Sequence, residues 1–250
     1  MIIGIAAQEF KSHFKTPMAW VLLAVLQIIL GYIFLTQVET FDLMQVKLAS
    51  IEGAPGLTDI IVTPLFSNAA IILLLVTPLL TMRVICEERR NKTLTLLLAA
   101  PISNMQIIIG KYLGTLTLLW LIVMLIALMP LSLLMGGELD IGKYLANVLA
   151  LILLVAAFTA TGIFLSTIAS HPTIAAMGTF GILLILWLFN ISKTISDQPN
   201  ELVEYLSLLN HYQNIQTGLI NSADILYFFL FVATFIVLSI SCLNKQRLQK

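Results

Sequence analysis

The spacing that comes nearest to a catalytic motif lies at residues 137–143, which read Gly-Glu-Leu-Asp-Ile-Gly-Lys. Two glycines and a lysine stand almost as they do in a phosphate-binding loop, where backbone N–H groups hold the phosphates and a following hydroxyl holds magnesium. Tyr144 replaces that hydroxyl here, no strand precedes the run, and Glu138 and Asp140 would repel a phosphate. We therefore interpret the match as a coincidence.

Other residue types that could do chemistry lack the partners they would need. The adjacent carboxylates Glu87 and Glu88 have basic neighbours, which favours solvated charge over acid–base catalysis. The sequence has no His-Glu-x-x-His, no Cys-x-x-Cys and no nucleophilic serine elbow. Cys86 and Cys242 both fall at predicted cytoplasmic helix ends, where disulfides rarely persist. We expect no catalytic, cofactor-binding or metal-binding residue in this chain, and no enzymatic activity of its own.

The elements that would position any site are predicted to be helices in a lipid bilayer. Of the 250 residues, 59% are hydrophobic and 10% are charged, and the mean hydropathy is +1.00. A soluble domain carries about 25% charged residues, so too few are present to cover a water-facing surface. The net charge is zero, which gives no reason to expect binding to nucleic acid. The composition favours an all-α, polytopic membrane protein.

Six apolar runs are long enough to cross a bilayer core, which needs roughly 20 helical residues. They cover residues 18–38, 60–82, 112–135, 145–167, 173–190 and 223–243. Each is expected to be a helix, because the backbone must satisfy its own hydrogen bonds in lipid. Asp224, at the edge of the last run, is the one acidic or basic residue inside them. This weighs against a proton-coupled carrier, which usually keeps ionisable groups near the midplane.

The distribution of charge predicts the orientation. Segments on the side of the N-terminus hold ten of the thirteen Lys and Arg residues, and the opposite segments hold ten of the thirteen Asp and Glu residues. Positive residues are retained in the cytoplasm during insertion. We expect a multi-pass protein of the inner (cytoplasmic) membrane, with both termini in the cytoplasm.

Residues 2–15 are expected to form a short amphipathic helix on the membrane surface. The apolar positions are Ile3, Ala6, Phe10 and Phe14, and the polar ones are Gln8, Lys11, Ser12 and Lys15. Thr16 and Pro17 then begin the first span, since proline is favoured at the first helical position. Glu9 interrupts the segment and no cleavage site follows, so a signal peptide is not expected. The pattern fits a simple anchor equally well.

The segment between the second and third runs, residues 83–111, is the most informative part of the chain. Mixed charges at 87–90 lead into residues 93–101, a predicted apolar helix that is too short to span. Its leucines are Leu94, Leu96, Leu97 and Leu98. Ser103, with Gln106 three residues later, predicts a capping box at the start of the third long helix. The leucines have to be buried in lipid headgroups or against a partner protein.

Residues 191–222, on the opposite side, are expected to contain a short amphipathic helix on the outer surface. Its apolar positions are Leu202, Val203, Leu206 and Leu209. His211 stands at its end, and we expect a surface histidine satisfied by solvent rather than a ligand.

The segment from Arg83 to Lys111 resembles the type-2 ABC export permeases. That family typically has Glu-Glu-Arg, two variable residues, Gly-Thr-Leu, a leucine-rich stretch, Pro, a branched residue, Ser and finally Gly-Lys. The matching residues here are Glu87-Glu88-Arg89-Arg90-Asn91-Lys92-Thr93-Leu94, Leu96-Leu97-Leu98, Pro101-Ile102-Ser103 and Gly110-Lys111. Lys92 stands where glycine is usual.

Both ends of the chain extend the resemblance. Residues similar to the family's N-terminal elbow helix are Glu9, Phe10, Lys11, Phe14 and Pro17. Residues similar to the gliding-motility permease branch, which is related to a permease for copper-enzyme maturation, are Tyr205, Ser207, His211, Tyr212, Gly218, Asp224, Tyr227 and Phe228.

The resemblance implies a half-transporter with an elbow helix at residues 1–17 and a six-helix membrane domain at 18–250. A coupling helix at 93–101 would dock on a cytoplasmic ABC ATPase dimer, which would itself bind the ATP and magnesium. The coupling residues would be Glu87, Glu88, Arg89, Arg90, Thr93, Leu94, Leu97, Leu98 and Pro101. A second permease copy, identical or different, would complete the path, and there is room for an additional membrane subunit with an extracytoplasmic domain.

Two other functions fit the same residues. A stand-alone channel or secondary transporter would move solute without any ATPase. A membrane scaffold of a motility or secretion assembly would keep its role when its ATPase partners are inactive.

Overall fold

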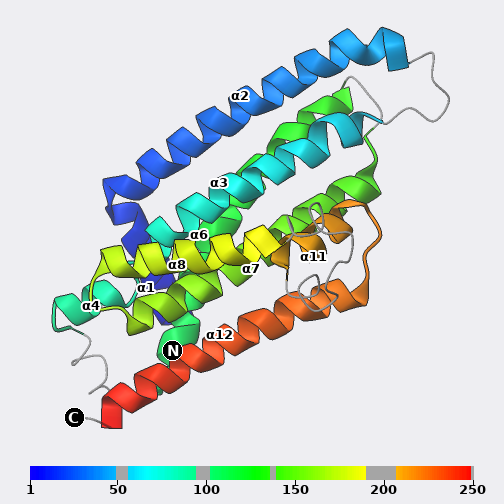
Figure 1. Ribbon diagram of the computed structural model, residues 1–250. Helices are drawn as coiled ribbons and strands as arrows, with labels where there is room; N and C mark the ends of the chain where they lie inside the picture. The colour runs from blue at the N-terminus through cyan, green and yellow to red at the C-terminus, as the bar shows by residue number, and fades with distance from the viewer. Residues whose placement is uncertain (49–55, 94–101, 136–138, 190–206, 249–250) are drawn as a thin grey trace.

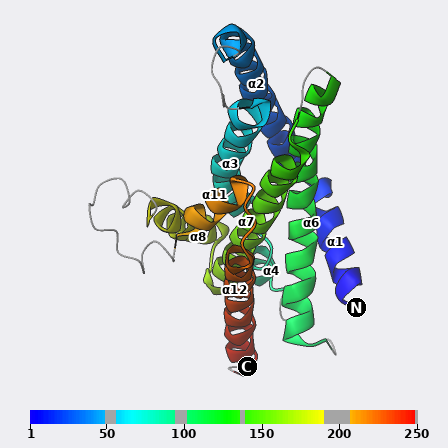
Figure 2. The same cartoon turned by 90° about the vertical axis from the view of Figure 1, so that its right-hand side faces the viewer.

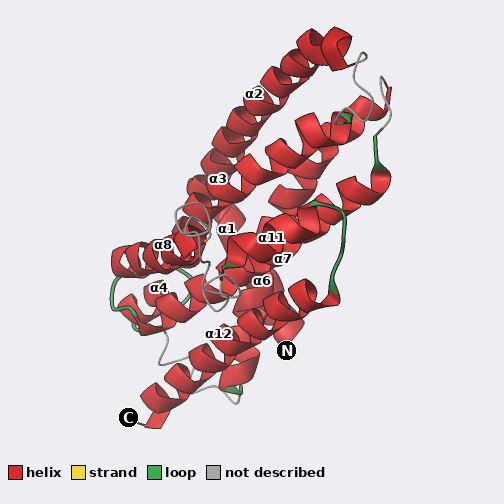
Figure 3. Ribbon diagram, turned by 45° about the vertical axis from the view of Figure 1, so that its right-hand side comes forward, coloured by secondary structure: helices red, strands yellow, loops and turns green. Residues whose placement is uncertain are grey.

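The computed structural model describes residues 1–48, 56–93, 102–135, 139–189 and 207–248. These residues form helices joined by short turns (Figure 1). No strand occurs among them (Figure 3). The prediction of an all-helical chain is confirmed.

The helices follow the predicted order. Their bounds are α1 Ile2–Lys15, α2 Pro17–Leu48, the π-helical turn η1 Thr58–Val62, α3 Thr63–Thr81, α4 Cys86–Arg90, α6 Asn104–Leu131, the 3-10 turn η2 Ser132–Met135, α7 Ile141–Ile168, α8 Pro172–Leu188, α11 Leu208–Gln216 and α12 Ser222–Leu248. The start of α6 confirms the capping box, because the Ser103 hydroxyl accepts from the N–H of Gln106 and the Gln106 side chain accepts from the N–H of Ser103.

Five helical stretches of the described chain are long and apolar enough to cross a membrane. They are Pro17–Met44, Thr58–Arg90, Asn104–Leu134, Ile141–Ile168 and Ser222–Lys245. The predicted run at 173–190 is occupied by α8, which is apolar but 17 residues long. At about 1.5 Å per residue it covers about 25 Å, less than a bilayer core of about 30 Å. The sixth span stays a prediction.

Helix α7 lies at the centre of the bundle. It contacts α3, α6, α8, α11 and α12, and most of its inward side chains are fully buried. Helices α2 and α12 lie on opposite sides of the bundle and expose large apolar side chains over much of their length (Figures 1 and 2). Both termini and α4 lie toward the same end of the bundle (Figures 1 and 2).

Helices α3 and α7 approach closely at Gly162. A Cβ atom at this position would lie 2.2 Å from the Thr81 Oγ1 atom, so only glycine fits. Small residues at helix crossings let backbones pack against each other in membranes, where no hydrophobic force drives helices together. Gly162 therefore sets the distance between the two most buried helices.

At the opposite end from the termini, the short helix α11 is fastened to α3 and α7 by buried hydrogen bonds. The Tyr212 hydroxyl donates to the carbonyl of Phe66 at 2.9 Å and accepts from the Gln216 amide at 3.0 Å. The Gln216 side-chain oxygen accepts from the hydroxyl of Ser67, and its backbone carbonyl accepts from the amide of Asn147. Burial raises the pKa of Tyr212, so its hydroxyl keeps its proton.

The expectation of a surface histidine at 211 is wrong. His211 is 4% exposed, its Nδ1 atom lies 2.6 Å from a carboxylate oxygen of Asp224, and its ring stacks on Tyr227 at 4.0 Å. The helix begins at Leu208, so His211 falls on the same buried face as Tyr212 and packs against α12. The outer helix expected near Leu202 lies outside the described residues.

Residues 140–144, which include the end of the sequence that resembles a phosphate-binding loop, form contacts that hold the start of α7 in place. Asp140 caps α7 by accepting from the N–H of Lys143, and its own N–H donates to the hydroxyl of Thr58. The Lys143 ammonium pairs with Asp59, and the Tyr144 hydroxyl donates to the carbonyl of Ala127. The lysine is thus paired with a carboxylate at the join between η1 and α7.

Substitution of Gly162 by Ala is expected to lower stability by about 1–3 kcal/mol, because the added methyl group would overlap Thr81 and force α3 and α7 apart. Gly181, in α8, has nothing within 4 Å of an added Cβ atom and provides the matched control. Thermal unfolding in detergent should show a lowered Tm for Gly162→Ala and an unchanged or raised Tm for Gly181→Ala. Equal Tm values would contradict the close approach.

Replacing Tyr212 by Phe is expected to cost about 1–3 kcal/mol, since it leaves the buried Gln216 amide without its acceptor. Tyr32, which is 70% exposed on α2, serves as the control position. The same thermal measurement should separate the two Tyr→Phe variants. A Tm for Tyr212→Phe as high as that for Tyr32→Phe would show that the network does not fasten α11.

Candidate functional site

A buried lysine joins three stretches of chain near the termini. The Lys111 ammonium donates to Glu9 in α1 at 2.9 Å, to Glu88 in α4 at 2.8 Å and to the carbonyl of Val84 at 2.9 Å. Lys111 is 3% exposed, and an ammonium has three N–H donors, so each of them has an acceptor. These four residues are called the Lys111 clasp below.

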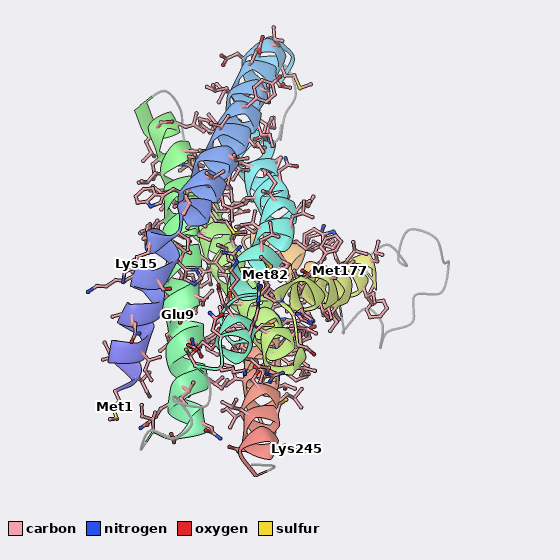
Figure 4. The ribbon with its side chains drawn as sticks, turned by 90° about the vertical axis from the view of Figure 1, so that its left-hand side faces the viewer. Met1, Glu9, Lys15, Met82, Met177 and Lys245 are labelled. Carbon is pink, nitrogen blue, oxygen red and sulfur yellow. The ribbon has the colours of Figure 1, made fainter. Side chains whose placement is uncertain are left out.

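Glycines next to the clasp allow α1 to lie directly on α6. A Cβ atom at Gly110 would lie 2.8 Å from the Ile5 side chain, and one at Gly114 would lie 2.7 Å from the carbonyl of Ala6 and from the Cβ atom of Glu9. Glu9 accordingly lies on the side of α1 that faces α6 (Figure 4). The Gly-x-x-x-Gly spacing, which is weak evidence in any membrane sequence, here brings the carboxylate to the lysine.

The face of α1 that packs agrees with the predicted one except at its start. Ala6, Phe10 and Phe14 are half-buried as expected, whereas Ile3 is 83% exposed. Ile5, Glu9 and His13 are also half-buried, because the side of α1 that meets the glycines of α6 carries polar as well as apolar residues. The position of α1 on the membrane surface stays a prediction.

A single residue, Thr16, connects α1 to α2. Thr16 has an extended backbone, as expected of a residue before proline, and Pro17 is the first residue of α2. The Thr16 hydroxyl donates to the carbonyl of His13, and the Trp20 indole donates to the carbonyl of Phe14. Phe14 also packs edge-on against Trp20 at 5.3 Å and against Phe10 at 5.0 Å.

On its other side, α4 is attached to the end of α7. The Arg89 guanidinium donates to the carbonyls of Ile168 and Ala169 at 3.2 and 3.1 Å and to that of Thr167. These carbonyls have no partner within α7, and a cation is favoured at a helix C-terminus. The Ser166 hydroxyl accepts from the N–H groups of Ile85 and Cys86, each at 3.1 Å. Helix α4 is therefore fixed to two different parts of the bundle.

A cavity of about 210 Å³ lies between α1, the end of α3 and α4. Its polar lining residues are Glu9, Ser12, His13, Thr16, Arg83, Glu87, Glu88, Asn91, Thr93 and Lys111. One oxygen of Glu88 faces Lys111, and the other is buried and has no hydrogen-bond partner among the described residues. The Lys111 clasp forms part of the lining of this cavity.

The turn after α4 contains a left-handed residue. Lys92 has φ of 58°, in the region that favours glycine, and the resembling permeases typically have glycine at this position. A lysine in this conformation costs roughly 1–2 kcal/mol relative to a right-handed one. The substitution of Lys for Gly therefore leaves the direction of the turn intact and adds strain.

The structure brings together two of the predicted elbow and coupling residues, Glu9 and Glu88, on Lys111. Arg89 is attached to α7, Thr93 donates to the carbonyl of Glu88, and Lys11, Glu87 and Arg90 are exposed. The coupling residues Leu94, Leu97, Leu98 and Pro101 lie outside the described residues, so the coupling helix is untested.

Sequence reasoning missed the central residue. The capping box at Ser103 placed Lys111 within the third long helix, but Lys111 was treated only as one of the basic residues of segment 83–111, and its burial and ion pairs were not expected. Its signal was available, because a single lysine within a long apolar helix requires partners. The sequence contains no comparable signal for Ser166 or for the carbonyl of Val84, since their roles arise only from the docking of the α3–α4 junction on α7 and α6.

The pKa of His13 is lowered from its ordinary value of 6.5 by burial, an effect that Glu9 opposes and Lys111 reinforces. A lowered pKa in the folded state means that the unfolded chain binds the proton first, so stability is full above pH 6.5 and falls as the pH drops below it. We expect Tm to decrease between about pH 7 and pH 5 more steeply for the wild type than for His13→Gln. Identical pH slopes would contradict this role for His13.

The chain was compared with known families and with curated proteins. No curated protein matches it. The family model described as ABC-2 family transporter protein matches residues 3–248, from α1 to the end of α12. The resemblance to type-2 ABC permeases is thereby confirmed, and the gliding-motility branch stays a prediction. This chain belongs to the ABC-2 family of transporters, as a membrane permease with several spanning helices.

Proposed function

We propose that this chain is the transmembrane subunit of an ATP-driven exporter. It would form the translocation path and receive force from a separate cytoplasmic ATPase through the loop between the second and third spans, at residues 93–101. Membership of the ABC-2 family supports transport in general. The coupling loop and the partner rest on the sequence and on the geometry around α4.

The observation that carries the proposal is the double attachment of α4. This short helix leads directly into residues 94–101, and it is joined to α1 and α6 through Lys111 and to α7 through Arg89. A segment that receives force needs a firm base, because a loose one would bend without moving the spans. The base of this segment is held by charge-assisted hydrogen bonds on both sides.

A topology with six spans and both ends in the cytoplasm fits the arrangement of the helices. The termini lie toward the same end, which requires an even number of crossings (Figures 1 and 2). Counting α8 with the five longer stretches gives six, and a helix about 25 Å long can span where the bilayer thins locally. The end that holds α4 carries most of the basic residues, which favours the cytoplasm.

The proposal divides the work between chains. The partner ATPase dimer would bind ATP and magnesium, and this subunit would bind neither. A second permease copy would face this one across the path, and the exposed apolar sides of α2 and α12 leave surface for it and for lipid. An additional membrane subunit with an extracytoplasmic domain is compatible with the same design.

We also propose that the chain belongs to the gliding-motility branch of the family. Within the resembling C-terminal motif, His211 contacts both Asp224 and Tyr227. Gly218 in the same motif has φ of +90°, which glycine adopts readily. These contacts give the motif a structural purpose, the attachment of α11 to α12.

Replacing Leu97 and Leu98 together by Asp is expected to abolish co-purification with the partner ATPase. Two charges cannot be buried in an apolar groove without a large desolvation cost. The measurement is pull-down of the detergent-solubilised complex, with membrane insertion checked by fractionation and size-exclusion chromatography. Unchanged association of the double variant would refute docking at this segment.

A matched control is available at the opposite end. Leu219 is 79% exposed between α11 and α12, on the side predicted to face away from the cytoplasm. Leu219→Asp adds a similar charge there and should leave the ATPase bound. Loss of association in this variant too would indicate a general effect of added charge rather than a docking site.

A further inference from the structure

The clasp connects both ends of the segment that is proposed to receive force. Val84 and Glu88 precede residues 94–101, and Lys111 follows them, one to two turns inside α6. The ammonium therefore links the entry of this segment directly to its exit, in addition to the indirect link through α7. Glu9 adds α1, which continues into α2 at Thr16, to the same point.

From this convergence we infer that Lys111 is a positioning residue that makes α1, α4 and the start of α6 move as one body when a partner displaces residues 94–101. The inference rests on the proposed function and specifies which helices would move when the ATPase displaces residues 94–101. Displacement of α4 would reach α2 through Glu9 and the Thr16 junction, in addition to any covalent path into α6.

Charge balance explains why a lysine is needed at this point. Two carboxylates, Glu9 and Glu88, share one buried ammonium, and without it two negative charges would face each other. Like charges that approach closely at a partly buried site repel each other. An uncharged residue at 111 would therefore separate α1 from α4 instead of simply weakening a contact.

The second attachment of α4 is independent of the clasp. Arg89 binds carbonyls at the end of α7, whereas the clasp joins α4 to α1 and α6. Loss of Lys111 should consequently free α4 from α1 while α4 stays on α7. This separation makes the inference measurable as a distance within one chain.

The test places spin labels at Gln8 and Arg90, which are exposed on α1 and α4 and lie outside the clasp. The background carries Cys86→Ala and Cys242→Ser. The label-to-label distance is measured by electron paramagnetic resonance in the permease–ATPase complex in lipid nanodiscs, before and after trapping with ATP and vanadate. With Lys111 present we expect one narrow distribution that is the same in both states.

In Lys111→Met we expect a broader distribution that shifts by several ångström on trapping, with the ATPase still bound. Lys143→Met removes the pair with Asp59 at the other end and should leave the distance unchanged. A narrow, unshifted distribution in Lys111→Met, or a shift on trapping in the chain with Lys111, would overturn the inference.

If Lys111→Met fails to fold, Glu88→Gln takes its place, since it keeps the shape and the Lys111–Glu9 pair and weakens only the link to α4. The same broadening is expected, and its absence would count against the clasp. The measurement without nucleotide needs no ATPase. If no ATPase associates with the chain, the proposed function fails, while the comparison of resting distances still decides whether Lys111 holds α1 to α4.

Discussion

A buried ammonium group needs a hydrogen-bond acceptor for each of its three N–H groups. This requirement determines how the helices are arranged at the end of the bundle where the termini lie. At Lys111 the acceptors come from α1, from α4 and from the backbone between α3 and α4. None of them is adjacent to Lys111 in sequence. Gly110 and Gly114 leave the space in which α1, and with it the acceptor Glu9, can approach α6. The close packing of α1 on α6 therefore allows the ion pair with Lys111 to form.

The opposite end of the molecule also contains buried polar groups that need partners, and these are mostly neutral groups with one histidine–carboxylate contact. Tyr212 and Gln216 close hydrogen bonds among α11, α3 and α7, and His211 meets Asp224 of α12. In both places a short polar element is fixed against long apolar helices by buried polar contacts. The apolar surface places helices in the bilayer, but these contacts decide which helices are neighbours.

The parts that sequence predicts well are those that depend on local composition. The apolar runs, the capping box at Ser103, the helix at 2–15 and its end before Pro17 all follow from residues close together in the chain. The prediction of an exposed His211 was wrong, and that of a buried Ile3 was wrong too, because burial depends on which helix lies opposite. The burial of Lys111 was missed for the same reason, since its partners in α1 and α4 are distant in sequence.

The position of α11 has a consequence for the order in which the chain matures during synthesis. Asn147 in α7 and Ser67 in α3 enter the membrane long before residues 208–216 emerge from the ribosome, and their partner Gln216 arrives only then. Until the last sixth of the chain is made, Ser67 and Asn147 can hydrogen-bond only within their own helices, to the carbonyls of Thr63 and Lys143. A nascent chain halted before α11 would therefore lack the hydrogen bonds that tie α3 and α7 to the C-terminal segment, so the bundle is completed only when that segment has been made.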